Sequence, residues 1–188
     1  MDQRRLKALP KLEGAQEIMD VYQVGATTGN KLVKWLADQG HSATGRSLIP
    51  HDVNMIPAAI EAGLGELGKH GSLINPELGS AIRLGCVAVD LPLLEDKPVN
   101  FLLDDFCTHC QVCTKACPPQ AMHADRQMVR GVEKWYIDFD KCLPYFNDTR
   151  GCGICLAVCP FSIPDRAPIL VNRLQRRRDR KMKSTPIN

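Results

Sequence analysis

The stretch F-C-T-H-C-Q-V-C-T-K-A-C-P, from Phe106 to Pro118, holds four of the nine cysteines of this 188-residue chain. These cysteines are separated by two, two and three residues, and a proline follows the last of them. This spacing is typical of ligation of a cubane [4Fe-4S] cluster in which the fourth cysteine binds a different cluster. The stretch therefore predicts a second cluster elsewhere in the chain and a role in moving electrons one at a time.

A second group of cysteines lies further along the chain and repeats this pattern. The segment C-G-I-C-L-A-V-C-P, from Cys152 to Pro160, has the same spacings of two and three residues and the same closing proline. Cys142 precedes it, separated by the inserted segment L-P-Y-F-N-D-T-R-G. Because the last cysteine of each run binds the other cluster, two ligand sets are predicted. The first set is Cys107, Cys110, Cys113 and Cys159, and the second set is Cys142, Cys152, Cys155 and Cys117.

Two structural zinc sites are the alternative interpretation of these cysteines. Zinc generally takes its thiolates from two separated C-x-x-C pairs, so the spacing favours the cubane. The inserted loop offers Tyr145, Phe146 and Arg150 for contact with a partner or substrate, or for packing that excludes water from the cluster. Cys86 lies outside both sets and is predicted to be a buried small apolar residue.

The overall composition is that of a globular protein, with 44% apolar and 24% charged residues. Thiolates kept available for metal indicate a reducing compartment, and we expect a cytoplasmic protein. Arg4-Arg5 resembles a twin-arginine export signal, but polar residues interrupt the stretch that follows it. No apolar run is long enough to span a membrane.

Composition divides the chain into three parts: residues 1–97, the cysteine-rich residues 98–168, and a basic tail over 169–188. Residues 1–20 are polar, with weak helical character. Hydrophobic periodicity predicts helices over 29–39 and 53–62, and strands over 42–49 and 81–91. Gly40 is placed to end the first helix in a left-handed conformation.

The segment from Gly63 to Gly68, G-L-G-E-L-G, matches the G-x-G-x-x-G dinucleotide fingerprint letter for letter. That fingerprint follows a strand and opens a helix. Here a predicted helix precedes the glycines and a turn-rich segment follows them, so the context is reversed and argues against NAD binding.

The longer segment A-A-I-E-A-G-L-G-E-L-G-K-H-G-S-L-I-N-P-E-L-G-S-A-I-R-L-G, starting at Ala58, is followed by V-D-L-P-L and the double cysteine module. This combination resembles the C-terminal part of the reductive dehalogenase and epoxyqueuosine reductase superfamily. The form G-E-L-G is more similar to the dehalogenase branch. The resemblance implies an α+β fold, in which a partial nitroreductase-like α/β corrinoid domain precedes a bacterial ferredoxin-like double [4Fe-4S] module.

The resemblance also implies a cobalamin, bound base-off, and a small organic, halogenated substrate. Gly63, Gly65, Gly68, Gly71 and Asn75 are then expected to let the backbone approach the corrin or its nucleotide tail. Members of the superfamily carry a substantial part before this region. The expected explanations here are that the chain is a fragment, that another chain completes the sheet, or that cobalamin binding has been lost.

In the dehalogenases a tyrosine with a basic neighbour supplies the proton for carbon–halogen reduction. By position Tyr22 is the candidate donor, and Arg83 or Lys69 is its candidate cation. A cation beside a phenol stabilises the phenolate and so makes the phenol a better acid. The alternatives are packing for Tyr22 and a salt bridge at the end of a strand for Arg83.

The tail from Arg173 to Lys183 concentrates the positive charge of the chain, whose net charge is +3. Leu170, Val171, Leu174 and Met182 are spaced to line one face of a helix. The arginines suit a nucleic acid such as transfer RNA, but they also suit an acidic electron donor such as ferredoxin or flavodoxin, or plain solvent.

Three functions remain open from sequence: a corrinoid-dependent reductase of the dehalogenase type, a ferredoxin-like electron carrier without its own catalytic centre, and an epoxyqueuosine reductase-like enzyme acting on tRNA.

Overall fold

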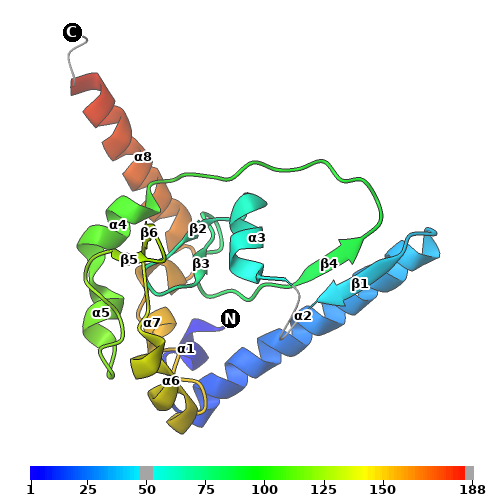
Figure 1. Ribbon diagram of the computed structural model, residues 1–188, viewed down its shortest axis with the longest axis horizontal. Helices are drawn as coiled ribbons and strands as arrows, with labels where there is room; N and C mark the ends of the chain where they lie inside the picture. Colours follow the sequence, from blue (N-terminus) through cyan, green and yellow to red (C-terminus); the bar gives the residue numbers. More distant parts are fainter. Residues whose placement is uncertain (47–52, 185–188) are drawn as a thin grey trace.

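The structure, a computed structural model, describes residues 1–46 and 53–184, which form helices joined to short antiparallel strands (Figure 1). The prediction of a mixed α and β chain is confirmed. Three two-stranded sheets occur in the described residues, and none of them is extended into a larger sheet there. No helix in this part of the chain is both long and apolar enough to cross a membrane.

Two helices, α1 (Gln3–Leu6) and α2 (Leu12–Asp38), open the chain. The sequence predicted a helix over 29–39 and only weak helical character over 1–20, whereas α2 is one helix that begins at Leu12. Its early turns are stabilised by tertiary ion pairs, because Arg5 binds Glu17 at 2.7 Å and Asp20 at 2.8 Å. As predicted, Gly40 follows the helix in a left-handed conformation, with φ +87°.

The first sheet lies along α2 and joins β1 (Ala43–Arg46) to β4 (Cys86–Val89) in antiparallel register. The predicted strand over 81–91 is therefore too long, and residues 47–49 of the other predicted strand lie outside the described residues. Cys86 is half-buried, so its predicted full burial is wrong. The exposed segment after β4 arches back to the cysteine-rich part of the chain (Figure 1).

Helix α3 (Met55–Glu61) precedes the glycine-rich residues 63–79, which we call the glycine stretch. This stretch contains a tight hairpin of β2 (Glu66–Leu67) and β3 (Leu73–Ile74). Glu66 fastens this hairpin to the cysteine module. Its carboxylate accepts hydrogen bonds from the backbone N–H of Phe101 at 2.7 Å and of Leu103 at 3.4 Å. Burial nevertheless raises the pKa of Glu66, because the carboxylate is partly removed from water.

The cysteine module consists of short elements around the two ligand sets. They are α4 (Leu103–Cys110), α5 (Val112–Ala116), β5 (Gln127–Val129), β6 (Val132–Lys134), α6 (Phe139–Asp148), α7 (Ile154–Ala157) and the 3-10 turn η1 (Pro160–Ser162). The prediction that the segment after Cys142 is a loop is wrong, since most of it belongs to α6. Asp138 caps this helix by accepting from the backbone N–H of Asp140 at 3.1 Å.

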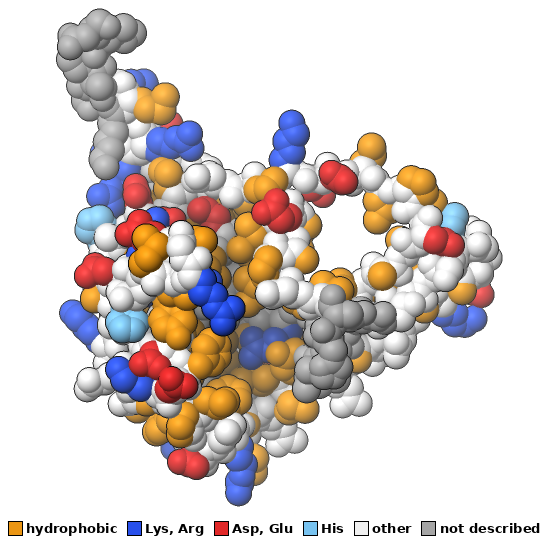
Figure 2. Space-filling model, in the orientation of Figure 1, with side chains coloured by type: hydrophobic (Ala, Val, Ile, Leu, Met, Phe, Trp, Pro, Cys, Tyr) orange, Lys and Arg blue, Asp and Glu red, His pale blue; other side chains and the backbone are white. Residues whose placement is uncertain are grey.

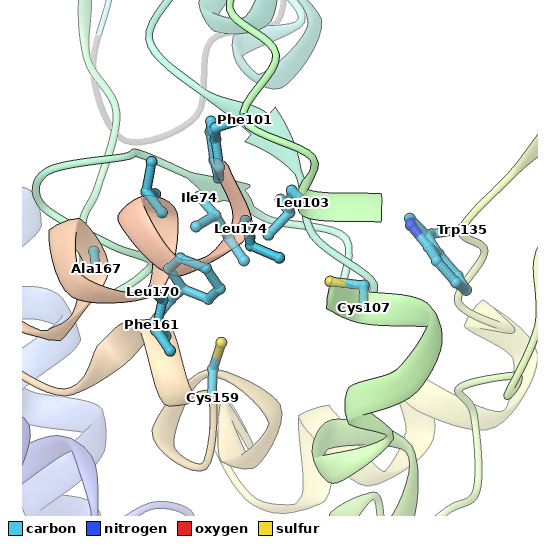
Figure 3. Close-up of a cluster of buried hydrophobic side chains, with 11 residues drawn as sticks. Ile74, Phe101, Leu103, Cys107, Trp135, Cys159, Phe161, Ala167, Leu170 and Leu174 are labelled. Atoms are coloured by element: carbon cyan, nitrogen blue, oxygen red, sulfur yellow. The ribbon is translucent and has the colours of Figure 1, made fainter. Parts of the chain in front are cut away.

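The core lies between the glycine hairpin, α4, η1 and helix α8 (Arg166–Ser184), as Figure 3 shows. Phe161 is 1% exposed and meets the ring of Phe106 edge to face, with ring centroids 5.0 Å apart. The predicted apolar face of α8 is confirmed for Leu170, Val171 and Leu174, which are buried. Met182 is exposed, because it lies where α8 projects beyond the body of the molecule (Figure 1).

Gly79 joins the glycine stretch to η1, and its replacement tests that junction. The residue has φ +74°, and a Cβ added there would collide with the carbonyl oxygen of Phe161. We expect Gly79→Ala to lower the free energy of unfolding by at least about 2 kcal/mol, measured by urea denaturation.

The matched control is Gly25→Ala in α2, where an added Cβ meets nothing within 4 Å. We expect this variant to raise the free energy of unfolding by up to about 1 kcal/mol, because alanine favours the helix. Equal stability of the two variants would contradict a tight junction at Gly79.

Candidate iron–sulfur centres and adjoining cavity

The first set of cysteines gathers from separate elements, as the exchange of last cysteines predicted. Cys107 and Cys110 come from α4, Cys113 from α5, and Cys159 from the turn before η1. Burial raises the pKa of Cys107 to about 12, and the neighbouring thiols of Cys159, Cys113 and Cys110 contribute to the rise. In Figure 3 the sulfur atoms of Cys107 and Cys159 point into a common space.

The second set gathers beside the first. Cys117 follows α5, Cys142 lies in α6, and Cys152 and Cys155 flank the start of α7. Burial raises the pKa of Cys155 to about 12, and Cys113 of the first set adds to that rise with Cys152 and Cys117. The two sets are therefore close enough for their thiols to interact.

The donors at these sites fit iron–sulfur clusters better than zinc. All nine cysteines are free thiols. Thiols at the spacing of the two runs are the ligands of [4Fe-4S] clusters, whereas zinc takes its thiolates from two separated C-x-x-C pairs. A donor also reaches one of the sulfurs, since the backbone N–H of Ala121 lies 3.3 Å from the Sγ of Cys117.

A cavity of about 890 Å³ opens beside the second set. Its walls come from the start of α2, from α6 and from the turn before α7, and most of their surface is apolar. Figure 2 shows hydrophobic side chains around a hollow in the centre of the molecule, with basic atoms at its base. The lining includes Tyr22, Arg83 and all four cysteines of the second set.

Tyr22 and Arg83 lie against each other at this cavity. The guanidinium carbon of Arg83 is 5.2 Å from the ring centroid of Tyr22, and Nη1 donates to the carbonyl of Ile82 at 3.1 Å. The Nε atom of Arg83 is buried and has no hydrogen-bond partner in the described part of the chain. Burial lowers the pKa of Arg83, while Tyr22 and Cys155 oppose that change. The structure thus brings together the predicted donor, one predicted cation and the second set.

Lys69, the other cation predicted for Tyr22, lies elsewhere. Its side chain is almost completely buried, and its Nζ donates to the carbonyl of Ala124 at 2.7 Å. The same ammonium group is 4.5 Å from the centroid of Trp135. It therefore accompanies the first set of cysteines and not the cavity.

The residues expected at a corrinoid have tight contacts with the protein's own chain. An added Cβ at Gly63 would lie 2.5 Å from the carbonyl oxygen of Lys97, and one at Gly71 would lie 2.8 Å from a methyl group of Ile137. Asn75 donates to the carbonyl of Leu64 at 2.7 Å and accepts from two backbone N–H groups of its own turn. Packing thus explains these residues, and their role at a corrinoid stays a prediction, as it does for Gly65 and Gly68.

Sequence reasoning missed His70, which is 4% exposed and lines the space between the cysteines of the first set. Burial lowers its pKa to about 4, so the imidazole is neutral. The only signal in the sequence was a Lys-His pair inside a glycine-rich turn, which by itself carries no metal-ligand spacing.

Comparison with known proteins identifies the cysteine module as an iron–sulfur domain. Residues 106–163 match the 4Fe-4S dicluster domain. The chain is 38% identical over 113 residues to tetrachloroethene reductive dehalogenase of Sulfurospirillum multivorans, covering 55% of this chain and 23% of that protein. It is 31% identical over 177 residues to epoxyqueuosine reductase of Synechococcus sp. (strain RCC307), covering 86% and 51%.

Solved structures place the chain closer to one branch. The catabolic reductive dehalogenase NpRdhA superposes with a TM-score of 0.80 at 29% identity, covering 93% of this chain and 27% of that one. A crystal structure of epoxyqueuosine reductase gives 0.59 at 20% identity. The homologues are thus reductive dehalogenases and epoxyqueuosine reductases, both oxidoreductases, and the structure is closer to the dehalogenases. The chain spans only about a quarter to a half of these relatives' lengths.

The exchange of cysteines between the sets is tested by replacing Cys117. Although this residue lies in the first motif, we expect Cys117→Ser to lose the second cluster and about half the iron. Its electron paramagnetic resonance spectrum after reduction should match that of Cys142→Ser and differ from that of Cys110→Ser.

The control variant Cys86→Ser should keep the iron content and brown colour of the unaltered protein. A Cys117→Ser spectrum matching that of Cys110→Ser would contradict the exchange, and a colourless protein holding zinc would contradict both clusters.

Proposed function

We propose that this chain is the electron-delivering and substrate-facing part of a cobalamin-dependent reductase that cleaves a carbon–halogen bond. The observation that carries the proposal is the shared wall of the cavity. Tyr22, Arg83 and the second set of cysteines all line it. A proton donor, a cation and a source of electrons would therefore meet at one apolar space.

Two [4Fe-4S] clusters, when bound by the two sets, would supply one-electron transfer toward the cavity, and a cobalamin there would supply low-valent cobalt. The second set is the proximal one, because its cysteines line the cavity. Cys107, Cys113 and Cys159 of the first set are buried, while Cys110 is only partly buried and gives the shortest approach from solvent. Corrinoid binding fits the mainly apolar lining and the unpartnered Nε of Arg83.

Tyr22 would hold the proton that the reaction consumes. Reductive cleavage of a carbon–halogen bond takes two electrons and one proton and releases a halide, so one donor hydroxyl is sufficient. Arg83 lies over the Tyr22 ring, and its charge would stabilise the phenolate left after proton transfer. The apolar walls suit a small organic, halogenated substrate, the kind named in the relative tetrachloroethene reductive dehalogenase.

Partners follow from the surfaces that remain exposed. An acidic electron donor such as ferredoxin or flavodoxin, in the cytoplasm, would suit the arginines of α8, which are exposed. The edges of the β1–β4 pair would accept strands from another chain or from another part of a longer protein.

Cobalamin binding by the reconstituted protein tests the proposal. We expect a cobalamin absorption spectrum in stoichiometric amount after incubation with iron, sulfide and hydroxocobalamin, followed by gel filtration. Clusters without a retained corrinoid would instead support the electron carrier without a catalytic centre of its own.

Replacement of the proposed proton donor tests its role separately. We expect Tyr22→Phe to lower the rate of halide release at least about 100-fold, the usual contribution of a positioned acid, with cobalamin binding unchanged. Phe139→Leu, at the same cavity, is the matched control and should keep most of the rate. An undiminished rate in Tyr22→Phe would remove this residue as the donor.

An epoxyqueuosine reductase-like function is the second candidate, favoured by the exposed arginines of α8 and by the relative that aligns with 86% of this chain. It predicts salt-sensitive binding of a tRNA anticodon stem-loop. Replacing Arg173, Arg177 and Arg180 by glutamine should then weaken binding. It should also make the slope of log K against log salt concentration shallower, by the amount that the loss of about three phosphate contacts gives. Lys115→Gln with Lys134→Gln, also exposed, is the control, and equal binding by both variants would reject the tail as the RNA site.

A further inference from the structure

The Lys69-His70 pair of the glycine stretch lies at the first set of cysteines, where the dehalogenation chemistry described above gives it no role. We propose that Lys69 and His70 set the reduction potential of the first cluster, with the buried ammonium group of Lys69 and the Nε2–H of His70 both stabilising its reduced state. This inference rests on the iron–sulfur part of the proposed function and is independent of cobalamin and substrate.

Lys69 is held beside the thiols by contacts that carry no compensating charge. The side chain is 2% exposed, its Nζ donates to the carbonyl of Ala124 at 2.7 Å, and it lies over the face of Trp135. The indole is itself fixed, because its Nε1 donates to Asp104 at 2.8 Å. Among the described residues, Lys69 forms no ion pair with a carboxylate.

The negative groups that act on Lys69 are three cysteines of the first set together with Asp125. Burial lowers the pKa of Lys69, whereas Cys113 and Cys107 act against that change before any carboxylate does. Lys69 and Cys107 both line the space between the cysteines of the first set. A buried ammonium group with these neighbours is placed as the counter-ion of a thiolate-bound cluster.

His70 adds a second, neutral donor. Its Nδ1 accepts a hydrogen bond from the backbone N–H of Ser72 at 3.3 Å, so the neutral ring carries its hydrogen on Nε2. This Nε2 is buried and has no partner in the part of the chain that the structure describes. Because His70 lines the same space as Cys107, Cys110, Cys113 and Cys159, a cluster sulfur is the acceptor available to it.

The direction of the effect follows from charge. Reduction by one electron adds one negative charge to the cluster, and no proton is needed. A nearby cation in a poorly solvated site and N–H donors to sulfur both favour the more negative state. Removing either group should therefore make the reduction potential of the first cluster more negative.

Redox titration of the full chain with both clusters, followed by electron paramagnetic resonance, tests this. For Lys69→Met we expect the equilibrium constant for reduction of the first cluster to fall at least tenfold, which is about 59 mV for one electron. The signal of the second cluster should titrate as in the unaltered protein. Lys69→Arg keeps the charge, so its equilibrium constant for reduction of the first cluster should stay within threefold of that of the unaltered protein.

The matched control is Lys115→Met. Lys115 lies in α5 between cysteines of both sets, but it is exposed and screened by water, so we expect less than a threefold change. His70→Leu should shift the first cluster in the same direction as Lys69→Met. Unchanged potentials in Lys69→Met and His70→Leu would overturn the proposal, as would equal shifts in Lys69→Met and Lys115→Met.

Failure of Lys69→Met to load the first cluster is also decisive. If Lys69→Arg then loads iron normally at the original potential, the positive charge is required at the cluster and the proposal stands. If both variants lose the same cluster, Lys69 acts by packing alone and the proposal is overturned. None of these measurements involves cobalamin, so they do not depend on the dehalogenase reaction.

Discussion

The structure depends on bringing eight thiols, three of them buried and five partly buried, into two neighbouring sets of four. Cys159 lines one space with Cys107, Cys110 and Cys113 of the first run, while Cys117 lines the cavity with the cysteines of the second run. Burial raises the pKa of thiols in both sets, to about 12 for Cys107 and Cys155. Buried thiolates are costly without a compensating charge, so cluster binding and folding of this module are coupled.

The glycine stretch contacts the elements that carry the first set of cysteines at both of its ends. Glu66 accepts from the start of α4, and Gly79 allows the backbone to touch that of Phe161. Lys69 and His70 lie between these two points and face the cysteines. The glycines thus permit close approach of one part of the protein to another, and the same approach brings a cation and an N–H donor to the thiols.

The cavity combines features from segments distant in the sequence. Tyr22 comes from α2, Arg83 from the segment before β4, and the cysteines from residues 117–155. The buried Nε of Arg83 has no hydrogen-bond partner among the described residues, which is unfavourable in a region that only packs. At an apolar cavity beside a cluster site, the same group is positioned to bind an acceptor that enters from outside.

Local chemistry was readable from the sequence alone. The cysteine spacing predicted two ligand sets, because exchange of the last cysteine is a property of the motif, and the members of each set line a common space in the structure. Gly40 was assigned correctly because a left-handed helix terminus is a local backbone preference. The apolar face of α8 followed from periodicity, but only the fold shows that its burial ends at Leu174, because Met182 lies on the part of the helix that leaves the core.

Tertiary structure decided the rest, since it depended on contacts between distant residues. Polar residues at the start of α2 became helical because Glu17 and Asp20 bind Arg5. The segment after Cys142 became a helix whose cap, Asp138, lies before it. Position alone gave Tyr22 two possible cations. Only the folded chain separates them, because the path of the glycine hairpin turns Lys69 toward the first set and leaves Arg83 at the cavity.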